Sequence, residues 1–195
     1  MDERKNSFNQ IRLAEERGQT AVVIVLCEKH LQKFPRHGPA WLHYGMAQVE
    51  LANYEEAQKA IRRAIKFCPA ASLSFPYLQM GNLIEARGDF KLAAMWYRKA
   101  AELRPNDATF HIYLGGNAWK RGMQKQAERH FQRALKCSEG CLEEAYFNLG
   151  GILLAKRKYP EAIKYYRAAL KVDPKYKIAK DRLADAELAL LMTGS

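Results

Sequence analysis

Apolar side chains recur at intervals of three and four residues along most of the chain, which is the spacing of one face of an α-helix. Ile163, Tyr166 and Leu170 keep this spacing, for example, and polar residues fill the positions between them. Short polar segments interrupt the pattern at regular distances. The pattern therefore predicts a chain of short amphipathic helices joined by tight turns, with no strands.

Four glycines stand in the same apolar and aromatic frame, and they divide the chain into equal units. They are Gly45, Gly81, Gly115 and Gly150, at spacings of 36, 34 and 35 residues. Twelve residues after each glycine comes an alanine, a large apolar or aromatic residue follows four later, and a second alanine follows three beyond that. Proline closes three of the units, and Glu139 takes its place in the other. A unit of about 34 residues is therefore repeated four times.

This frame resembles the tetratricopeptide repeat, in which an aromatic residue, Leu-Gly, Ala, Phe and Pro recur in the same order. The resemblance implies two antiparallel helices in each unit, because a single hairpin cannot bury its apolar face without stacking on the next. The expected fold class is all-α, a right-handed α-solenoid of stacked antiparallel helix pairs. Ala52 and Arg157 depart from the pattern, since they replace the glycine between the two helices that Gly88 and Gly122 keep.

The expected organisation is one repeat domain over residues 1–195. Upstream of the first full unit, residues 4–37 form a degenerate hairpin. Beyond the last unit, residues 177–192 form a capping helix with Leu183, Leu188 and Leu191 turned inward and a charged outer face that includes Arg182. The full repeats are expected at 38–71, 74–107, 108–141 and 143–176.

The search for catalytic and metal-binding motifs is negative. The sequence has no phosphate-binding glycine loop, no dinucleotide fingerprint, no H-E-x-x-H and no G-x-S-x-G. His130, Cys137 and Cys141 fit no standard zinc spacing and lack a fourth ligand. The prediction is a protein that is not an enzyme and uses no cofactor and no metal.

Length and composition place the chain among folded soluble proteins. It has 195 residues, of which 48% are hydrophobic and 27% charged. The longest apolar run covers residues 21–27, whereas a membrane span needs about 20. The amino terminus carries two acids and no apolar run, so it lacks the features of a secretory signal or transit peptide. We expect no membrane span and a cytoplasmic location.

The resemblance implies that partners bind in a concave groove formed by the first helix of each hairpin. The groove positions are mostly apolar, which favours an amphipathic helix or an extended apolar segment of a partner protein. Some of these side chains, Trp119 and Phe147 above all, can instead pack against a neighbouring hairpin. Family members that hold carboxylate tails carry several Lys, Asn and Arg groove residues, of which the best register here keeps only Asn148 and Arg182, so that activity is not expected. The predicted groove residues are Leu42, Met46, Phe75, Leu78, Asn82, Ile112, Trp119, Phe147 and Leu154.

The formal net charge of +11 suggests a second function. Basic residues gather on the second helices, so a basic convex face could bind nucleic acid, another anionic surface or an acidic partner. No aromatic residue is clearly interleaved for base stacking, and basic residues at these positions are common in the family, so a solvated surface is the favoured explanation of the charges. The chain is therefore predicted to be an interaction adaptor or scaffold, with binding through the basic face as the alternative. That face comprises Arg62, Arg63, Lys66, Arg98, Lys99, Arg133, Lys136, Lys164 and Arg167.

Overall fold

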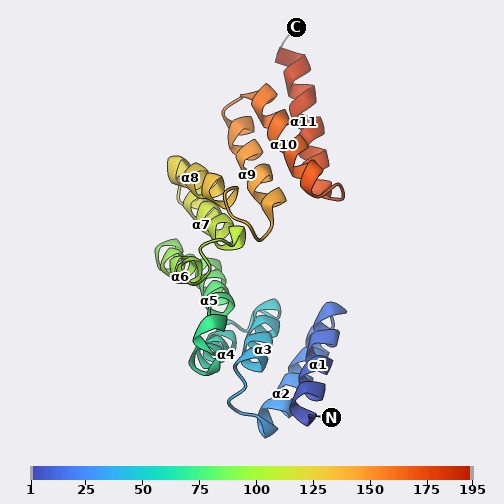
Figure 1. Ribbon diagram of the computed structural model, residues 1–195, viewed down its shortest axis with the longest axis vertical. Coiled ribbons are helices and arrows are strands. Elements are labelled where there is room, and N and C mark those ends of the chain that lie inside the picture. The colour runs from blue at the N-terminus through green and yellow to red at the C-terminus, as the bar shows by residue number, and fades with distance from the viewer. Residues whose placement is uncertain (1, 194–195) are drawn as a thin grey trace. The chain divides into compact units, whose positions relative to one another are not determined.

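The structure is a computed structural model that describes residues 2–193 (Figure 1). These residues form eleven α-helices and one short 3-10 helix, and none of them belongs to a β-strand. The fold is all-α, a solenoid of antiparallel helix pairs, which confirms the helices that the apolar spacing predicts and the fold class that the repeat resemblance implies. The chain divides into two compact units, Met1–Leu103 and Arg104–Ser195, called here the N-terminal and C-terminal units.

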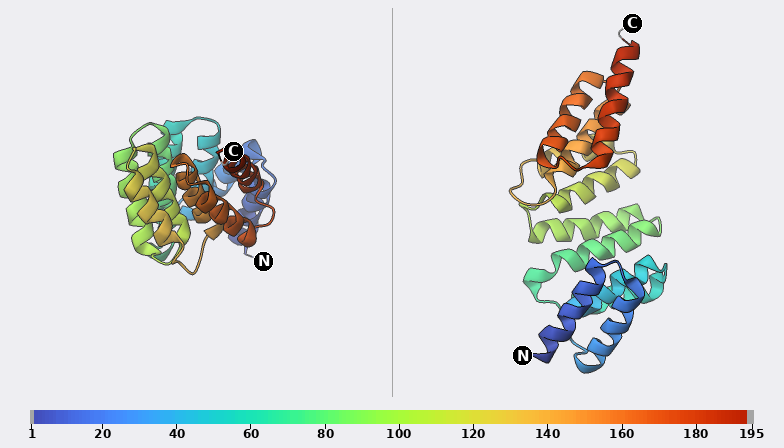
Figure 2. Two further views of the ribbon diagram at one scale, coloured as in Figure 1. Left: turned by 90° about the horizontal axis from the view of Figure 1, so that it is seen from above. Right: turned by 90° about the vertical axis from the view of Figure 1, so that its right-hand side faces the viewer.

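The N-terminal unit consists of three helical hairpins, in which each helix packs on the next one along the chain. The antiparallel course of neighbouring helices can be followed in Figure 2. Its elements are α1 (Glu3–Glu16), α2 (Thr20–Lys33), α3 (Gly38–Glu50), α4 (Tyr54–Phe67), the 3-10 helix Ala70–Ser72, α5 (Ser74–Ala86) and α6 (Phe90–Leu103).

The C-terminal unit consists of two hairpins and one further helix, and again each helix packs on the next. Alanines line the contacts between helices, and one large ring, such as Phe131 or Tyr166, fills the space inside each hairpin. Its elements are α7 (Ala108–Lys120), α8 (Gln124–Ala134), α9 (Leu142–Ala155), α10 (Tyr159–Val172) and α11 (Lys177–Thr193).

The turns inside the hairpins have left-handed backbone at the second position after the first helix. Gly88 and Gly122 have φ angles of 87° and 72° there. Ala52 and Arg157, which replace glycine in the other two repeats, adopt the same conformation with φ angles of 59° and 56°. A side chain at such a position is strained, because its Cβ approaches the neighbouring carbonyl oxygen. The repeat geometry therefore holds even where the sequence departs from glycine.

The connection before α9 differs from the other repeats because Glu139 stands where a proline is expected. The backbone N–H of Ala108 donates to the carbonyl oxygen of Glu139 at 2.8 Å, and the N–H of Glu139 donates to that of Asn106 at 3.2 Å. Arg104 adds an ion pair of 2.6 Å to the Glu139 carboxylate. The two loops that flank α7 and α8 are thus joined by backbone pairing, which the repeat pattern does not predict.

The prediction for the last helix is wrong at two leucines. Leu188 is 59% exposed and Leu191 is 72% exposed, whereas Ala179 and Ala186 are fully buried. Leu183 packs against the core of the unit, as predicted. The reason is that α11 turns its small side chains toward α10, and position 188 lies nearly opposite position 186 on a helix of 3.6 residues per turn.

Candidate functional site

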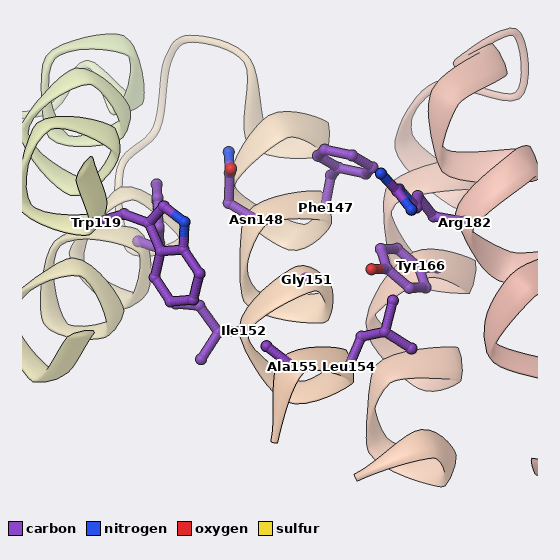
Figure 3. A pocket seen from close by; sticks show the side chains of 10 residues that line it. Trp119, Phe147, Asn148, Gly151, Ile152, Leu154, Ala155, Tyr166 and Arg182 are labelled. Atoms are coloured by element: carbon purple, nitrogen blue, oxygen red, sulfur yellow. The ribbon is translucent and has the colours of Figure 1, made fainter. Parts of the chain in front are cut away.

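A cleft of about 380 Å³ opens in the C-terminal unit. This volume lies in the range of sites that hold small ligands or side chains of a partner. All five helices of the unit contribute to its lining (Figure 3). The lining residues are Trp119, Phe131, Phe147, Asn148, Gly151, Ile152, Leu154, Ala155, Tyr166 and Arg182.

Helix α9 supplies most of the cleft. Phe147, Gly151 and Leu154 follow one another at intervals of four and three residues, so they lie on one face of the helix. Figure 3 shows Trp119 on one side of α9, and Tyr166 and Arg182 on the other. Trp119 comes from the C-terminal end of α7 and is 39% exposed. A large indole therefore stands beside an apolar helix face without being covered by it.

The aromatic wall opposite Trp119 is held in place by packing. The ring centroid of Phe147 lies 5.8 Å from that of Tyr166 and 5.4 Å from that of Tyr176. Burial raises the pKa of the Tyr166 phenol, so its hydroxyl stays protonated at neutral pH and can donate a hydrogen bond. A Cβ atom added at Gly151 would lie 3.8 Å from this hydroxyl oxygen. Glycine at 151 therefore keeps the cleft open next to the phenol.

Two polar side chains complete the cleft. The amide Nδ2 of Asn148 donates to the carbonyl oxygen of Glu144 at 2.7 Å, which fixes the direction of the side chain. Nη1 of Arg182 lies 3.4 Å from Oδ2 of Asp185, and both side chains are exposed. Such an exposed pair contributes little stability, so the guanidinium can exchange this partner for another at low cost. The cleft thus combines apolar walls with a cation and an amide.

The structure brings together three of the nine predicted groove residues in this cleft, namely Trp119, Phe147 and Leu154. Two others do not lie on an open surface. Leu78 is 3% exposed and Ile112 is 7% exposed, because both pack into the core. The expectation that they line an open groove is therefore wrong.

The remaining four predicted residues lie in the N-terminal unit. Phe75 is 45% exposed on α5, and Leu42 is partly buried on α3. Met46 borders a crevice of about 30 Å³ formed with α1 and α2. Asn82 accepts a hydrogen bond of 2.9 Å from the Tyr97 hydroxyl through Oδ1, so the interior of the hairpin already uses this oxygen.

Arg182 is the cleft residue that sequence reasoning places wrongly, on the charged outer face of α11. The structure brings it next to Phe147 and Tyr166, in the cleft that Asn148 also lines (Figure 3). A signal for this existed in the sequence, because Asn148 and Arg182 are the two positions that match the carboxylate-binding register of the family. Periodicity alone cannot show it, because Arg182 lies on a helix outside the four repeats.

All nine predicted basic residues are exposed, and several of them are held by neighbours. The Cζ atom of Arg63 lies 4.4 Å from the ring centroid of Trp41, and Nζ of Lys99 lies 4.7 Å from that of Trp96. Arg167 forms an ion pair of 2.7 Å with Glu187. Two tryptophans of the N-terminal unit therefore stand beside predicted basic residues, which the sequence pattern does not indicate.

Within residues 2–193, no group of three or more His, Cys, Asp or Glu side chains is arranged to hold a metal ion. None of the helices described has the length and apolar character to cross a membrane.

The stacked helix pairs and their similar turns define a protein built from helical hairpin repeats. Sequence models of the tetratricopeptide repeat match residues 38–70, 76–107 and 143–176, which together make up about half of the chain. The chain belongs to the tetratricopeptide repeat family.

Relatives and solved structures agree with this assignment. The cell division cycle protein 16 homolog of Homo sapiens is 28% identical over 146 residues, which cover 71% of this chain and 23% of that protein. The thermophilic TPR protein TTC0263 of Thermus thermophilus has a similar structure, with a TM-score of 0.72, 21% identity, and coverage of 95% of this chain and 99% of the other. YrrB, described as a TPR protein with an unusual peptide-binding site, gives a TM-score of 0.60 and 19% identity, with coverage of 90% and 89%. The chain spans about a quarter of the length of the first curated relatives that it matches.

Proposed function

We propose that this chain is a non-enzymatic interaction scaffold that binds an amphipathic helix or an extended apolar segment of a partner protein in the cleft of the C-terminal unit. The observation that carries the proposal is the open apolar cleft between Trp119 and the Phe147 wall. The likeness in fold to YrrB, whose description names a peptide-binding site, supports it.

The chemistry of the lining favours a peptide with one large apolar anchor. Covering the exposed part of Trp119 and Leu154 removes apolar surface from water, at about 25 cal/mol per Å². Tryptophan is also enriched among the residues that dominate protein interfaces. Arg182 and Asn148 add a cation and an amide that can fix the direction of the bound segment through its backbone carbonyls or an acidic side chain.

We extend the proposal to the N-terminal unit, where Phe75 is exposed and Leu42 is partly buried. Phe75, on the first turn of α5, is proposed as the main apolar contact there.

A displayed peptide library tests the cleft. Peptides selected on the wild-type protein are measured by fluorescence anisotropy against Trp119→Glu and against Val172→Glu, an exposed apolar residue of α10 outside the cleft. We expect Trp119→Glu to weaken binding about tenfold or more and Val172→Glu to leave it unchanged. Equal binding to all three proteins, at matched melting temperatures, would show that the cleft is not the site.

The second candidate function is binding of a polyanion through the basic residues of the second helices. The observation in its favour is that Arg62, Arg98, Arg133, Lys136 and Lys164 are exposed and that no recorded ion pair joins them to an acid among residues 2–193. Cations left free by the protein can displace the counterions of a phosphate backbone.

Salt dependence tests this second function. Binding of a labelled single-stranded DNA of about 16 nucleotides is measured at about 50 and about 200 mM salt. The proposal expects the affinity of the wild-type protein to fall steeply as salt rises. At about 50 mM salt, it expects Arg133→Ser/Lys136→Ser to bind the DNA more weakly than Lys125→Ser, a variant of an exposed residue at the start of α8 outside the predicted set. An affinity independent of salt and of these substitutions would rule the function out.

A further inference from the structure

A second cleft, of about 400 Å³, opens in the N-terminal unit on the side of α2 and α4, the second helices of their hairpins. None of the nine predicted groove residues lines it. Its composition also differs from that of the first cleft, because two carboxylates stand beside two aromatic rings. The lining residues are Glu28, Leu31, Gln32, Pro35, Trp41, Tyr44, Glu56 and Arg63.

Two rings of α3 form the wall of this cleft. The centroids of Trp41 and Tyr44 lie 6.0 Å apart, and the ring planes meet at 85°. The indole Nε1 of Trp41 donates to the carbonyl oxygen of Pro35 at 2.8 Å, which fixes the orientation of its ring. Both side chains are only partly buried. The wall is therefore a preformed aromatic corner that solvent can reach.

The two carboxylates come from helices on either side of this corner. Glu28 lies on α2 and Glu56 on α4. Burial raises the pKa of the Tyr44 phenol, and both carboxylates raise it further, so both act on the same hydroxyl. Glu56 has an exposed ion pair of 3.3 Å with Lys59, whereas no recorded hydrogen bond or ion pair joins Glu28 to another described side chain. The cleft thus concentrates negative charge in a chain whose net charge is +11.

Arg63 shows which chemical group the aromatic corner accepts. Its guanidinium carbon lies 4.4 Å from the Trp41 ring centroid, a distance typical of stacking between a cation and an aromatic ring. No ion pair within the described part of the chain joins Arg63 to Glu28 or Glu56. The protein's own cation therefore covers one ring face and leaves the carboxylates available.

We propose that this cleft binds an arginine side chain of a partner protein, with the guanidinium on the Trp41 and Tyr44 corner and its N–H groups donating to Glu28 and Glu56. Arginine fits better than lysine, because its planar fork can stack on a ring and donate two parallel hydrogen bonds to a carboxylate. This site is distinct from the apolar cleft of the C-terminal unit, so a partner can use either one alone.

The proposal predicts binding against the overall charge of the protein. A cationic peptide is repelled by a net charge of +11, so non-specific electrostatics cannot produce its binding. Only a local arrangement of carboxylates and rings can attract it. Binding of a short arginine peptide therefore tests for this local site and not for general electrostatic attraction.

The experiment is a titration followed by nuclear magnetic resonance. The probe is a blocked Ser-Gly-Arg-Gly-Ser peptide, and the comparison peptide carries citrulline, a neutral analogue, in place of arginine. We expect saturable shifts of the Trp41 indole N–H and of the Tyr44 amide with the arginine peptide, and about tenfold weaker binding of the citrulline peptide. Shifts spread over scattered acidic residues, or equal affinity for both peptides, would overturn the proposal.

Matched variants separate the cleft from general charge effects. Glu28→Gln/Glu56→Gln is expected to weaken binding about tenfold or more, whereas Glu55→Gln, an exposed neighbour on α4 outside the cleft, should leave it unchanged. Arg63→Ala should strengthen binding, since it frees the ring face, and weaker binding in that variant would contradict the proposed stacking. Trp119→Glu should bind the arginine peptide like the wild type, even if the function proposed for the C-terminal cleft fails.

Discussion

The ring of Phe131 on α8 lies so close to the backbone of Gly115 on α7 that a Cβ atom at position 115 would stand 2.5 Å from Cε1 of the ring. The same relationship joins Gly150 to Tyr166, where the distance would be 2.8 Å, and a Cβ at Gly45 would lie 2.8 Å from Cγ1 of Ile61. Each of these three hairpins is therefore closed by a glycine that admits one large side chain. This contact explains why glycine and a bulky residue sixteen positions later recur together in the sequence.

Two adjacent glycines of α7 allow this contact to be tested. Gly115→Ala should lower the free energy of unfolding by about 1–3 kcal/mol, because the added methyl group overpacks the Phe131 ring. Gly116→Ala places the same group where no atom lies within 4 Å, so it should raise stability by up to about 1 kcal/mol through helix propensity. Urea denaturation of both variants measures the difference. Equal effects at the two positions would show that the close contact is not what selects glycine.

The strained turns offer a second test. Ala52→Gly and Arg157→Gly should each stabilise the protein by about 1 kcal/mol, because glycine adopts positive φ without the Cβ clash. Arg157→Ala keeps the strain and removes the charge, so it should have little effect. Gly88→Ala should instead destabilise the protein, because it places a side chain at a position with positive φ. Thermal unfolding, followed by circular dichroism, measures the stability of each variant. If Arg157→Ala also stabilised the protein, the charge at position 157 and not the backbone strain would explain the effect.

A buried pair of histidines makes the stability of the N-terminal unit depend on pH. Nε2 of His30 lies 2.7 Å from Nδ1 of His37, and Nδ1 of His30 lies 2.7 Å from the Ser7 hydroxyl. Burial lowers the pKa of His37 to about 4, with Arg4, His30 and His43 contributing in the same direction. The folded state therefore resists protonation of this ring.

The sign of the pH effect follows from this shift. The unfolded chain takes up a proton on His37 near pH 6.5, whereas the folded chain does so only near pH 4. The contribution of this group to stability is complete above pH 6.5 and falls between pH 6.5 and 4, by about 3 kcal/mol. In His37→Gln this contribution is absent, so the free energy of unfolding should decline less steeply over the same range. Parallel curves for the two proteins in urea denaturation would contradict the prediction.

Leu78 is buried, so a substitution there measures protein stability and not the loss of a contact with a partner. Leu78→Glu should lower the free energy of unfolding by several kcal/mol, about 3–5, because it places an unpaired charge in the core. Phe75→Glu, three residues earlier, should change it by less than about 1 kcal/mol, since an acid in the first turn of α5 is favourable for the helix dipole. Melting temperatures distinguish the two. Loss of binding in a Leu78 variant would therefore reflect loss of structure and not the removal of a contact.

The comparison of Leu78 with Phe147 shows how far the sequence can predict the site. Both residues stand three positions before a repeat glycine. The spacing therefore predicts that they lie at equivalent positions on the first helix of their hairpins. Leu78 is buried, whereas Phe147 is partly open and lines the cleft. The difference depends on how the neighbouring hairpin covers each residue, which is a property of packing between hairpins. The helices follow from the apolar spacing and the solenoid from the resemblance to the repeat family, but the lining of a cleft follows from neither.

Gly151 provides a variant that should separate binding from stability. Gly151→Leu extends a side chain into the cleft from a position where the added Cβ meets only the Tyr166 hydroxyl oxygen, at 3.8 Å. Leucine also has a higher helix propensity than glycine by up to about 1 kcal/mol, so the protein should remain folded and become slightly more stable. Peptides selected on the wild-type protein should bind about tenfold or more weakly, because the new side chain occupies their place. Val172→Leu, at an exposed position of α10 outside the cleft, is the control and should bind as the wild type does. Undiminished binding to a stable Gly151→Leu protein in fluorescence anisotropy would place the peptide elsewhere on the chain.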